Sequence, residues 1–241
     1  MSLALAVPLL LLFASCLVVV GPDRTLYART KLAAYPVGAA FVGAIAILFV
    51  VVARGPIAVR FYDPTSITTL AFPIGFYIDR LSAVMMTLIT GVSTVIYCYS
   101  TGYMYQDRHF RRYLALICIT DFVLLCMVSS ANLMMLFLFW QVLSYLLYLL
   151  AHNHAHAATL RGAFKTFTLL RVADAAFLAG IVLAYQLYGT LEFHDLFDRA
   201  VGNPITLSLW PGLEISASTA VTSLLFIGAM GKARDAIDPR S

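Results

Sequence analysis

Long runs of apolar residues, separated by short polar stretches, dominate the chain. A helix that crosses a membrane needs roughly 20 mostly apolar residues. Seven stretches approach this length: residues 3–20, 32–53, 81–103, 113–130, 133–150, 163–188 and 215–230. Because these runs are continuous and do not alternate with a period of two, they predict helices and not the strands of a membrane barrel. The predicted fold class is therefore an all-α, polytopic transmembrane bundle of about seven helices.

Two segments at the margins of this pattern need separate interpretation. The first run has no basic residues before it and no small-residue cleavage site after it, so it predicts a retained helix and not a signal peptide. Residues 189–204, "GTLEFHDLFDRAVGNP", mix acidic and apolar positions ahead of Trp210 and Pro211. This mixture predicts a short interfacial helix between the sixth and seventh spans.

The basic residues of the connecting loops predict the orientation in the membrane. Cytoplasmic loops carry an excess of Lys and Arg. The first, third and fifth loops hold more of them than the even loops: Arg24, Arg29, Lys31, Arg108, Arg111, Arg112 and Arg161, against Arg54, Arg60 and Arg199. We therefore expect a protein integral to the bacterial cytoplasmic (inner) membrane, embedded in its lipid, with the N-terminus outside and the C-terminus in the cytoplasm.

Composition agrees with this class and excludes others. Hydrophobic residues make up 61% of the 241 residues and charged residues 12%, far from the roughly 25% charged of a soluble domain. The net charge of +4 is not concentrated in a basic, aromatic-interleaved patch, so no nucleic-acid partner is expected. Neither a Rossmann glycine pattern nor a P-loop occurs, so no cofactor is expected in this chain.

Cysteine, histidine and tyrosine residues offer weaker signals. Four cysteines lie inside apolar runs without metal-binding spacing and are interpreted as packing residues: Cys16, Cys98, Cys118 and Cys126. His152, His154 and His156 recur with a period of two, which places side chains on one face only in an extended strand. Because they lie in a predicted loop beside a helix end, they are interpreted as interfacial residues that can be protonated and not as a metal site. His109 is interpreted as an exposed loop residue. The tyrosines near the end of the third span predict an interfacial belt: Tyr97, Tyr99, Tyr103 and Tyr105.

The chemistry-bearing residues lie inside the apolar runs. Arg171 and Asp174, three residues apart in "LLRVADAAFLAG", share one face of a helix and can neutralise each other. Each would cost roughly 2.5 to 3.5 kcal/mol at a helix centre by itself. The pair alone could simply lock two helices together. Further polar groups on other spans favour a proton or ion relay instead: Lys165, Asp121, Gln141 with Ser144, and Lys232, which we expect near Arg171 and Asp174.

Four segments carry a resemblance to a known family. They are "FYIDRLSAVMMTLITGVSTVIYCYSTGYM", "NLMMLFLFWQVLSYLLYLL", "TLLRVADAAFLAGIVLA" and "LLFIGAMGK". In this order they resemble the proton-translocating membrane subunits related to the L-type subunit of complex I and to Mrp antiporters. More narrowly, "LFLFWQVLSYLLYLLAHNHAHAATLRGAFKTF" and "YGTLEFHDLFDRA" look like DabB, the membrane subunit of DAB-type inorganic-carbon transporters. That resemblance implies a DabA-like partner similar to beta-carbonic anhydrases, which would hold the zinc.

The chain departs from the resembled family in two places. Complex I subunits typically carry a titratable glutamate after the tryptophan of the fifth helix, whereas Gln141 follows Trp140 here and cannot titrate. The family also continues past the glycine and lysine of the seventh helix into a second half. We accordingly expect an antiporter-like domain over residues 1–230, a polar, truncated or out-of-frame tail over 231–241, and possibly a second chain that supplies the missing half.

Three functions remain open from the sequence. The first is a membrane subunit of an energy-coupled carbon dioxide or bicarbonate uptake complex, which provides cation or proton translocation to the zinc partner. The second is a proton-pumping membrane subunit of a complex I-like NADH:quinone oxidoreductase, against which Gln141 argues. The third is a non-conducting membrane anchor. In each case the chain itself is expected not to be an enzyme.

Overall fold

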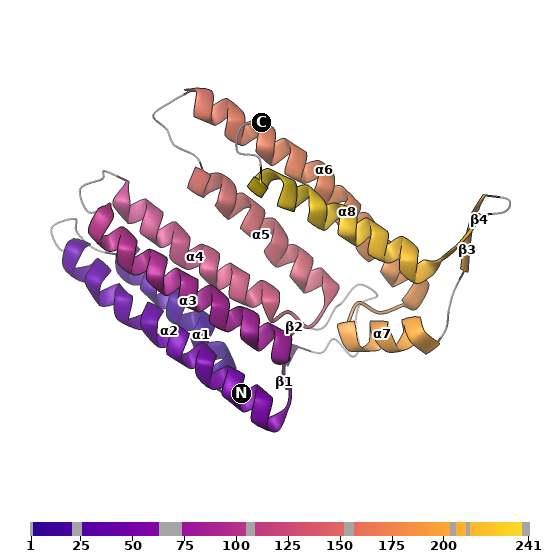
Figure 1. The fold of residues 1–241 in the computed structure, drawn as a ribbon, viewed down its shortest axis with the longest axis horizontal. Coiled ribbons are helices and arrows are strands. Elements are labelled where there is room, and N and C mark those ends of the chain that lie inside the picture. Colours follow the sequence, from indigo (N-terminus) through magenta and orange to yellow (C-terminus); the bar gives the residue numbers. More distant parts are fainter. Residues whose placement is uncertain are drawn as a thin grey trace.

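The computed structural model describes residues 2–20, 26–62, 74–104, 109–151, 157–202, 206–210 and 213–237. In these residues the chain forms a bundle of long helices with two short β-hairpins at one end (Figure 1). The long helices are α1 (Ser2–Val19), α2 (Leu26–Arg54), α3 (Arg80–Tyr103), α4 (Phe110–Val128), α5 (Leu133–Ala151), α6 (Ala157–Tyr188) and α8 (Ala217–Ile237). Each of the seven predicted spans therefore corresponds to one helix.

Four of the long helices also have the length and composition of a membrane span: Thr30–Arg54, Arg80–Tyr103, Leu133–Leu150 and Arg171–Tyr188. Shorter apolar helical stretches cover Ala6–Val19 and Ala217–Gly231. Helix α4 is 19 residues long and carries Arg111, Arg112 and Asp121, which lowers its apolar content. The all-α transmembrane architecture expected from the sequence is thus present, with charged residues concentrated in particular helices.

Packing divides the bundle into two parts. Helices α1, α2, α3 and α4 contact one another in a closed ring, α1 with α2, α2 with α3, α3 with α4 and α4 with α1. Helix α4 then contacts α5, α5 contacts α6, and α6 packs extensively on α8. The largest apolar core lies inside the four-helix ring and includes Leu11, Ile47 and Met86. A second core, around Phe177 and Ile181, joins α6 to α5 and α8.

One end of the bundle carries an element that the apolar pattern did not predict. Strands β1 (Ile57–Tyr62) and β2 (Ile74–Ile78) pair antiparallel, with Val59 opposite Phe76. Strand β2 also contacts the connection between α4 and α5, where the Tyr77 amide donates to the Ser129 carbonyl at 2.8 Å. In turn, the Leu133 amide donates to the Leu191 carbonyl beyond α6 at 3.0 Å. Backbone hydrogen bonds therefore join the second, fourth and sixth connections at one end of the bundle.

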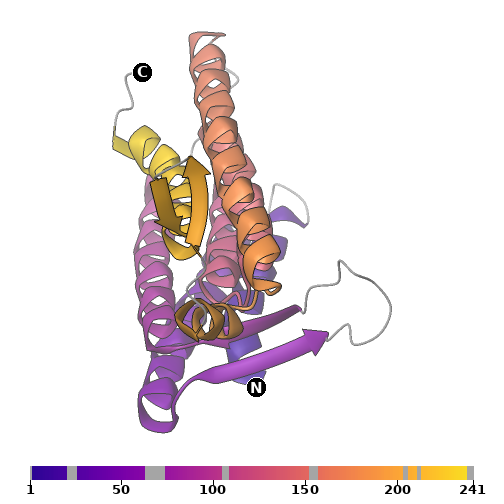
Figure 2. The same ribbon diagram turned by 90° about the vertical axis from the view of Figure 1, so that its right-hand side faces the viewer.

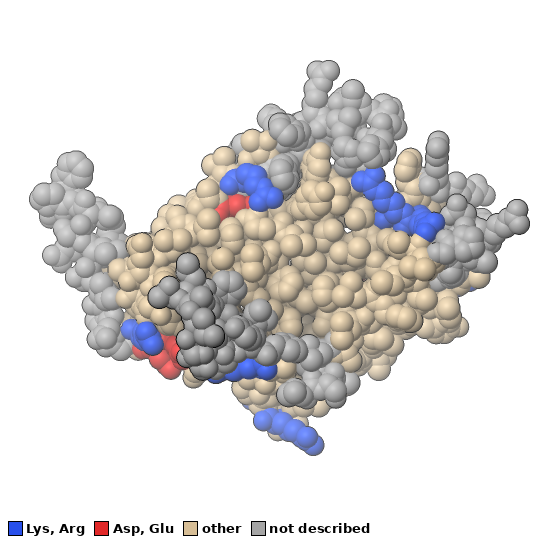
Figure 3. All heavy atoms as spheres, turned by 180° about the vertical axis from the view of Figure 1, so that it is seen from behind, with Lys and Arg blue, Asp and Glu red and all other residues tan. Residues whose placement is uncertain are grey.

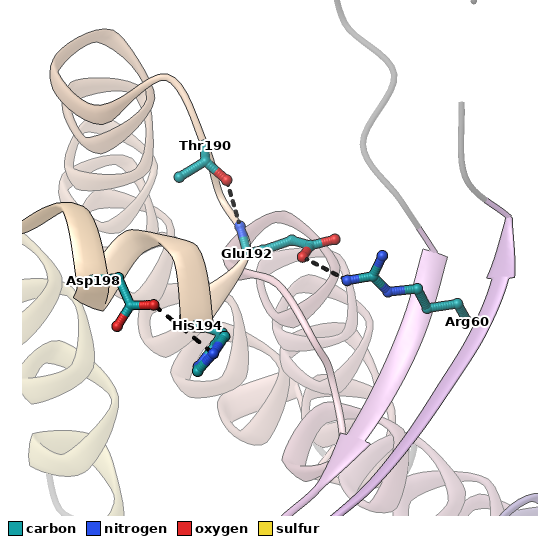
Figure 4. Close-up of polar contacts among 5 residues, drawn as sticks. All are labelled: Arg60, Thr190, Glu192, His194 and Asp198. Atoms are coloured by element: carbon teal, nitrogen blue, oxygen red, sulfur yellow. Dashed lines mark hydrogen bonds and ion pairs between the residues drawn. The ribbon is translucent and has the colours of Figure 1, made fainter. Parts of the chain in front are cut away.

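The sixth connection contains the predicted short helix and a second hairpin. Helix α7 (Phe193–Gly202) follows α6, and strands β3 (Thr206–Trp210) and β4 (Leu213–Ser216) precede α8. Figure 2 shows α7 beside the β1–β2 hairpin at the end of the helices. Glu192 at the start of α7 pairs with Arg60 of β1 at 3.3 Å (Figure 4), and His194 lies 3.8 Å from Asp198 on α7. The prediction of a short helix in this loop is confirmed.

Grouping of the even connections agrees with an alternating path through the membrane. The start of α1 and the end of α8 lie at opposite ends of the bundle in Figure 1, as an odd number of crossings requires. On the face shown in Figure 3, Lys, Arg, Asp and Glu occupy a few separated places, and other residues form the area between them. Which end is cytoplasmic remains a prediction from the loop charges.

One interpretation made from the sequence needs correction, and two features extend the expected picture. Helix α8 continues past the predicted span, to Ile237. Two hairpins add short strands to the predominantly helical fold. The predicted tyrosine belt fits Tyr99 and Tyr103, which are exposed and stacked at 5.6 Å, but it is wrong for Tyr97, which is 1% exposed.

The cysteines and histidines named from the sequence differ in how exposed they are. Cys118 and Cys126 are buried packing residues as expected, whereas Cys16 and Cys98 lie on exposed faces of α1 and α3. His109 is exposed ahead of α4. His152, His154, His156 and Tyr105 lie outside the described residues.

Candidate functional site

Asp174 is the centre of a polar cluster between α5 and α6. It is only 4% exposed, and its Oδ1 accepts a 2.7 Å hydrogen bond from the indole Nε1 of Trp140 on α5. Its Oδ2 lies 3.6 Å from Nη1 of Arg171, one turn earlier on α6. Both carboxylate oxygens therefore face a donor or a cation, as a buried charge in an apolar bundle requires.

Arg171 links the same two helices through a second contact. Its Nη1 also donates to the side-chain oxygen of Gln141 on α5. The Arg171 side chain is 42% exposed, whereas that of Asp174 is 5% exposed. The ion pair therefore has an interior partner and a partner nearer the surface of the bundle. Gln141 contacts the cation with a neutral oxygen, so this position can hold Arg171 in place without exchanging a proton.

Aromatic rings support the acidic partner. The Trp140 ring stacks on the Phe177 ring with centroids 5.2 Å apart. The Phe137 ring also stacks on Phe177, with centroids 6.0 Å apart. Phe177 lies one turn after Asp174, so its ring fixes the indole that donates to the carboxylate. Packing of this kind restricts the rotamer of Trp140 and thereby the direction of its N–H.

Helix α8 approaches α6 closely at this level. A Cβ on Gly228 would lie 2.6 Å from Cβ of Phe177, and a Cβ on Gly231 would overlap the side chain of Ala173. Only glycine permits this spacing, as small residues do in membrane helix pairs. Gly231 directly precedes Lys232, and Ala173 directly precedes Asp174. The turn of α8 that carries Lys232 thus lies beside the turn of α6 that carries the acid.

The structure brings together three of the six predicted relay residues: Gln141, Arg171 and Asp174. Lys165 belongs to α6 and Lys232 to α8, but both side chains lie outside the described residues. Asp121 lies elsewhere, on the side of α4 that packs against α3, close to the Ser93 hydroxyl. Among the described residues no group of His, Cys, Asp and Glu could hold a metal ion.

Sequence reasoning missed the role of Trp140. It named this residue as part of a motif, but not as the direct partner of Asp174. One signal was present, because an indole N–H inside an apolar helix needs an acceptor and few acceptors exist at membrane depth. The choice among those acceptors depends on how α5 and α6 are rotated toward each other, which their sequences do not state.

The cluster is suited to moving charge between helices. Asp174 is shared by a neutral donor on α5 and a cation on its own helix, so a change in either contact alters the balance of the other. A further cation or proton close to Asp174 would compete with Arg171 for Oδ2, which accepts no hydrogen bond among the described residues. Ionisable groups at membrane depth are costly, which makes this cluster the candidate functional site.

Two family models match the chain. Residues 65–114 match the model described as NADH-ubiquinone oxidoreductase (complex I), chain 5 N-terminus. Residues 130–236 match the model described as NADH:quinone oxidoreductase/Mrp antiporter, TM. The second model covers α5, α6, α7 and nearly all of α8, and so includes the whole Asp174 cluster.

Individual relatives agree with these models. NADH-quinone oxidoreductase subunit L of Neisseria meningitidis is 36% identical over 168 residues, which are 68% of this chain and 25% of that protein. NADH-ubiquinone oxidoreductase chain 5 of Triticum aestivum is 32% identical over 159 residues, which are 66% of this chain and 24% of that protein. The matched region thus corresponds to about a quarter of the length of these relatives.

Solved structures share the fold. Respiratory complex I from Thermus thermophilus with bound NADH contains a chain that superimposes with a TM-score of 0.70 at 18% identity, over 94% of this chain and 43% of that one. The membrane-bound sulfane sulfur reductase, an archaeal respiratory membrane complex, gives a TM-score of 0.64 at 18% identity with the same coverages. The helix arrangement described above is therefore shared with chains of these two respiratory complexes.

Proposed function

Because the chain belongs to the superfamily of complex I chain 5 and Mrp antiporter membrane subunits, we propose that it relays protons or cations within a membrane complex. The observation that carries this proposal is the cross-helix pairing of Asp174. It is buried, bonded to Trp140 on α5 and ion-paired with Arg171, which itself contacts Gln141. A contact that only holds two helices together would need one such partner, whereas several partners allow the Asp174 carboxylate to change the group with which it pairs.

Lys232 is the proposed switching cation. Its backbone neighbour Gly231 packs against Ala173, which supports a position within reach of Asp174. A proton that arrives near Lys232 changes how strongly this cation competes with Arg171 for the carboxylate. Arrival of this proton would then change the contacts between α6 and α8. Lys165, on the same helix as Asp174, is the proposed next group of the relay.

For the complex in which this relay works, we propose energy-coupled uptake of carbon dioxide or bicarbonate. The partner would be a DabA-like zinc protein similar to carbonic anhydrases, and the zinc would belong to that partner. Support comes from the sequence resemblance to DabB and from Gln141, which holds Arg171 with a neutral side chain where the resembled proton pumps carry a glutamate. The remaining translocation groups would be supplied by a further chain or segment.

A complex I-like oxidoreductase is the alternative. The named relatives are subunits of NADH-quinone oxidoreductases, and the matched region includes the Asp174 cluster. In that case the redox chemistry would lie in other chains, and this chain would provide a membrane pathway. A non-conducting anchor is the third possibility, in which the Asp174 cluster would serve packing alone.

Partner identity separates the first two functions. The chain is purified from its native host in a mild detergent, and the proteins that copurify are identified by mass spectrometry together with their metal content. We expect a zinc-containing protein of the carbonic-anhydrase type. Recovery of NADH- or quinone-reactive subunits without any zinc protein would reject carbon uptake in favour of the oxidoreductase.

Charge relay itself is tested in the complete complex reconstituted in vesicles. Asp174→Asn keeps an acceptor for Trp140 but removes the charge that pairs with Arg171. We expect it to abolish cation-dependent or proton-dependent transport, measured with a pH-sensitive dye. The matched control is Glu192→Gln, which removes a carboxylate at the end of the bundle and should leave transport close to wild type. Full activity in Asp174→Asn would leave the cluster with a packing role only.

A further inference from the structure

A row of hydroxyl groups runs along the buried face of α3. Thr90, Ser93, Tyr97 and Ser100 recur at intervals of three and four residues, so they lie on one side of the helix. Each is at most 4% exposed. From Thr90 to Ser100 the helix rises about 15 Å, which is half of the roughly 30 Å hydrocarbon layer. Apolar residues usually fill such a face, so this one is unusually polar for a membrane helix.

Asp121 lies against the middle of this row. It belongs to α4, is 8% exposed, and lies close enough to the Ser93 hydroxyl of α3 to interact with it. The Cys118 thiol, one turn earlier on α4, lies close enough to interact electrostatically with both Asp121 and Tyr97. The carboxyl group is therefore continuous with the hydroxyl row and not isolated among apolar side chains.

The row leads toward one particular end of the bundle. Tyr97 donates from its phenol to the Thr30 carbonyl of α2 at 3.0 Å. Thr30 lies in the first turns of α2, and Tyr97 and Ser100 lie in the last turns of α3. These helix ends adjoin the first and third connections, opposite the β1–β2 hairpin. The polar groups thus extend from the centre of α4 to the end that is predicted to be cytoplasmic.

An apolar layer separates this row from the Asp174 cluster. Val123 of α4 packs with Leu143 and Leu146 of α5, and Ile119 and Phe139 adjoin them. Asp121 projects to the opposite side of α4, toward α3. The polar groups of α3 and α4 and those of α5 and α6 consequently form two distinct sets.

Asp121 has no cationic partner among the described residues, unlike Asp174. The titratable groups that face it there are the Cys118 thiol on α4 and, beyond it, the Tyr97 phenol on α3. The packed parts of α1 and α2 contribute the neutral groups of Ser15 and Thr30. A buried carboxylate without a cation is costly, and a protonated carboxyl can instead donate to a hydroxyl oxygen.

We propose that Asp121 is a second proton-binding site, reached from the end formed by the first and third connections along the hydroxyl row of α3, and separate from the Arg171–Asp174 pair. The proton would move between Asp121 and Ser93 and continue past Tyr97, with each hydroxyl able to accept one proton as it donates another. This site is a property of the α1–α4 ring and extends beyond the relay proposed for α5, α6 and α8.

The experiment uses infrared difference spectroscopy on the full chain in lipid nanodiscs, titrated with acid and base. The carbonyl stretch of a protonated carboxylic acid is recorded in wild type and in Asp121→Asn. We expect a titrating band that Asp121→Asn removes and Asp174→Asn does not. Ser93→Ala should shift the frequency of this band, whereas Ser93→Thr, which keeps a hydroxyl, should leave it near the wild-type frequency. Thr120→Val, which removes a buried hydroxyl outside the row, should not shift the frequency. A spectrum without any Asp121 band at any pH would overturn the proposal.

The route is tested separately by exchange into heavy water, which shifts the same band. Tyr97→Phe removes the phenol that bonds to Thr30, so it should slow deuteration of Asp121 severalfold. Tyr99→Phe is the matched control, because Tyr99 lies on the exposed face of α3, and it should exchange at the wild-type rate. Equal rates in both variants would exclude the hydroxyl row as the path. Since neither measurement involves transport, both results are independent of the proposed relay through Asp174.

Discussion

Trp140 and Asp174, which are 34 residues apart in the chain, are joined by a 2.7 Å hydrogen bond between α5 and α6. The bond connects a neutral donor to a carboxylate that also faces Arg171. Because Trp140 is stacked on Phe177, the donor is held in one direction. The acid therefore has a neutral partner held by ring stacking and a cationic partner on its own helix.

Replacing Trp140 with phenylalanine isolates the contribution of this bond. Phe retains a ring that can stack on Phe177 but has no N–H, so Oδ1 of Asp174 loses its donor inside the bundle. We expect a loss of about 1–3 kcal/mol in the free energy of unfolding, the cost of an unsatisfied buried acceptor. Unfolding of the detergent-solubilised protein measures it. Tyr145→Phe, at an exposed position of the same helix, is the control and should change little.

Removing the two partners of the ion pair should have unequal effects. Among the described residues, Arg171→Ala leaves the buried carboxylate of Asp174 with Trp140 alone, and we expect a loss of about 3–5 kcal/mol, as for other broken buried pairs. Asp174→Ala leaves an arginine that is partly exposed and still bonded to Gln141, so the loss should be smaller. The double variant should lose less than the sum of the two single losses.

Transport by the complete complex provides the second measurement on the same variants. If the proposed relay operates, all three variants should fail to transport, since each removes a charge that it uses. A double variant that accumulates normally and transports at the wild-type rate would assign the charges to packing alone.

The close approach of α8 to α6 predicts strong sensitivity at two glycines. Gly228→Ala and Gly231→Ala each place a methyl group against Phe177 or Ala173, and overpacking of this kind costs about 1–3 kcal/mol. Gly38→Ala is the matched control, because a methyl group there meets open space and alanine favours the helix by about 0.5–1 kcal/mol. Thermal unfolding of the three variants compares them directly. A loss in Gly38→Ala equal to the others would contradict the close-packing explanation.

The Arg60–Glu192 pair should contribute little to stability despite joining distant segments. Its side chains are 64% and 21% exposed, and pairs of this kind contribute up to about 1 kcal/mol. A double-mutant cycle with Arg60→Ala and Glu192→Ala should give a coupling energy below that limit, decreasing as salt is added. Larger coupling, or coupling independent of salt, would mean that the hairpin and α7 are held together more tightly than the exposed pair allows.

Orientation in the membrane is tested by thiol labelling of intact cells. The exposed cysteines Cys16 and Cys98 are first replaced by serine. Asp198→Cys, on α7, should then react with an impermeant maleimide from outside, because the sixth connection is predicted to be external. His109→Cys should react only after the membrane is permeabilised. The reverse labelling pattern would invert the predicted topology.

The sequence by itself determined the number, length and order of the long helices, because backbone hydrogen bonds in a membrane must be satisfied within each apolar segment. It also determined that Arg171 and Asp174 share a face, since three residues make nearly one helical turn. The short α7 was predictable for a similar reason, from the local alternation of acidic and apolar residues.

Contacts between helices were decided only by the tertiary structure. A helix that is apolar on nearly every side does not specify which face turns toward a neighbour. For this reason the sequence placed Asp121 in one relay with Asp174, whereas the structure turns Asp121 toward Ser93 on α3. It likewise assigned Tyr97 to a membrane-surface belt, although rotation of α3 buries this ring and directs its hydroxyl to Thr30.

The β1–β2 hairpin shows the same limit at the level of the backbone. Strand β2 is held by pairing with β1 and by amide contacts to residues near Ser129, which lie far along the chain. Local pattern does not record such pairing, because it depends on which connections emerge at the same end of the bundle. The rotation of each helix and the meeting of distant connections are therefore properties of the folded chain, set by packing that no single segment contains.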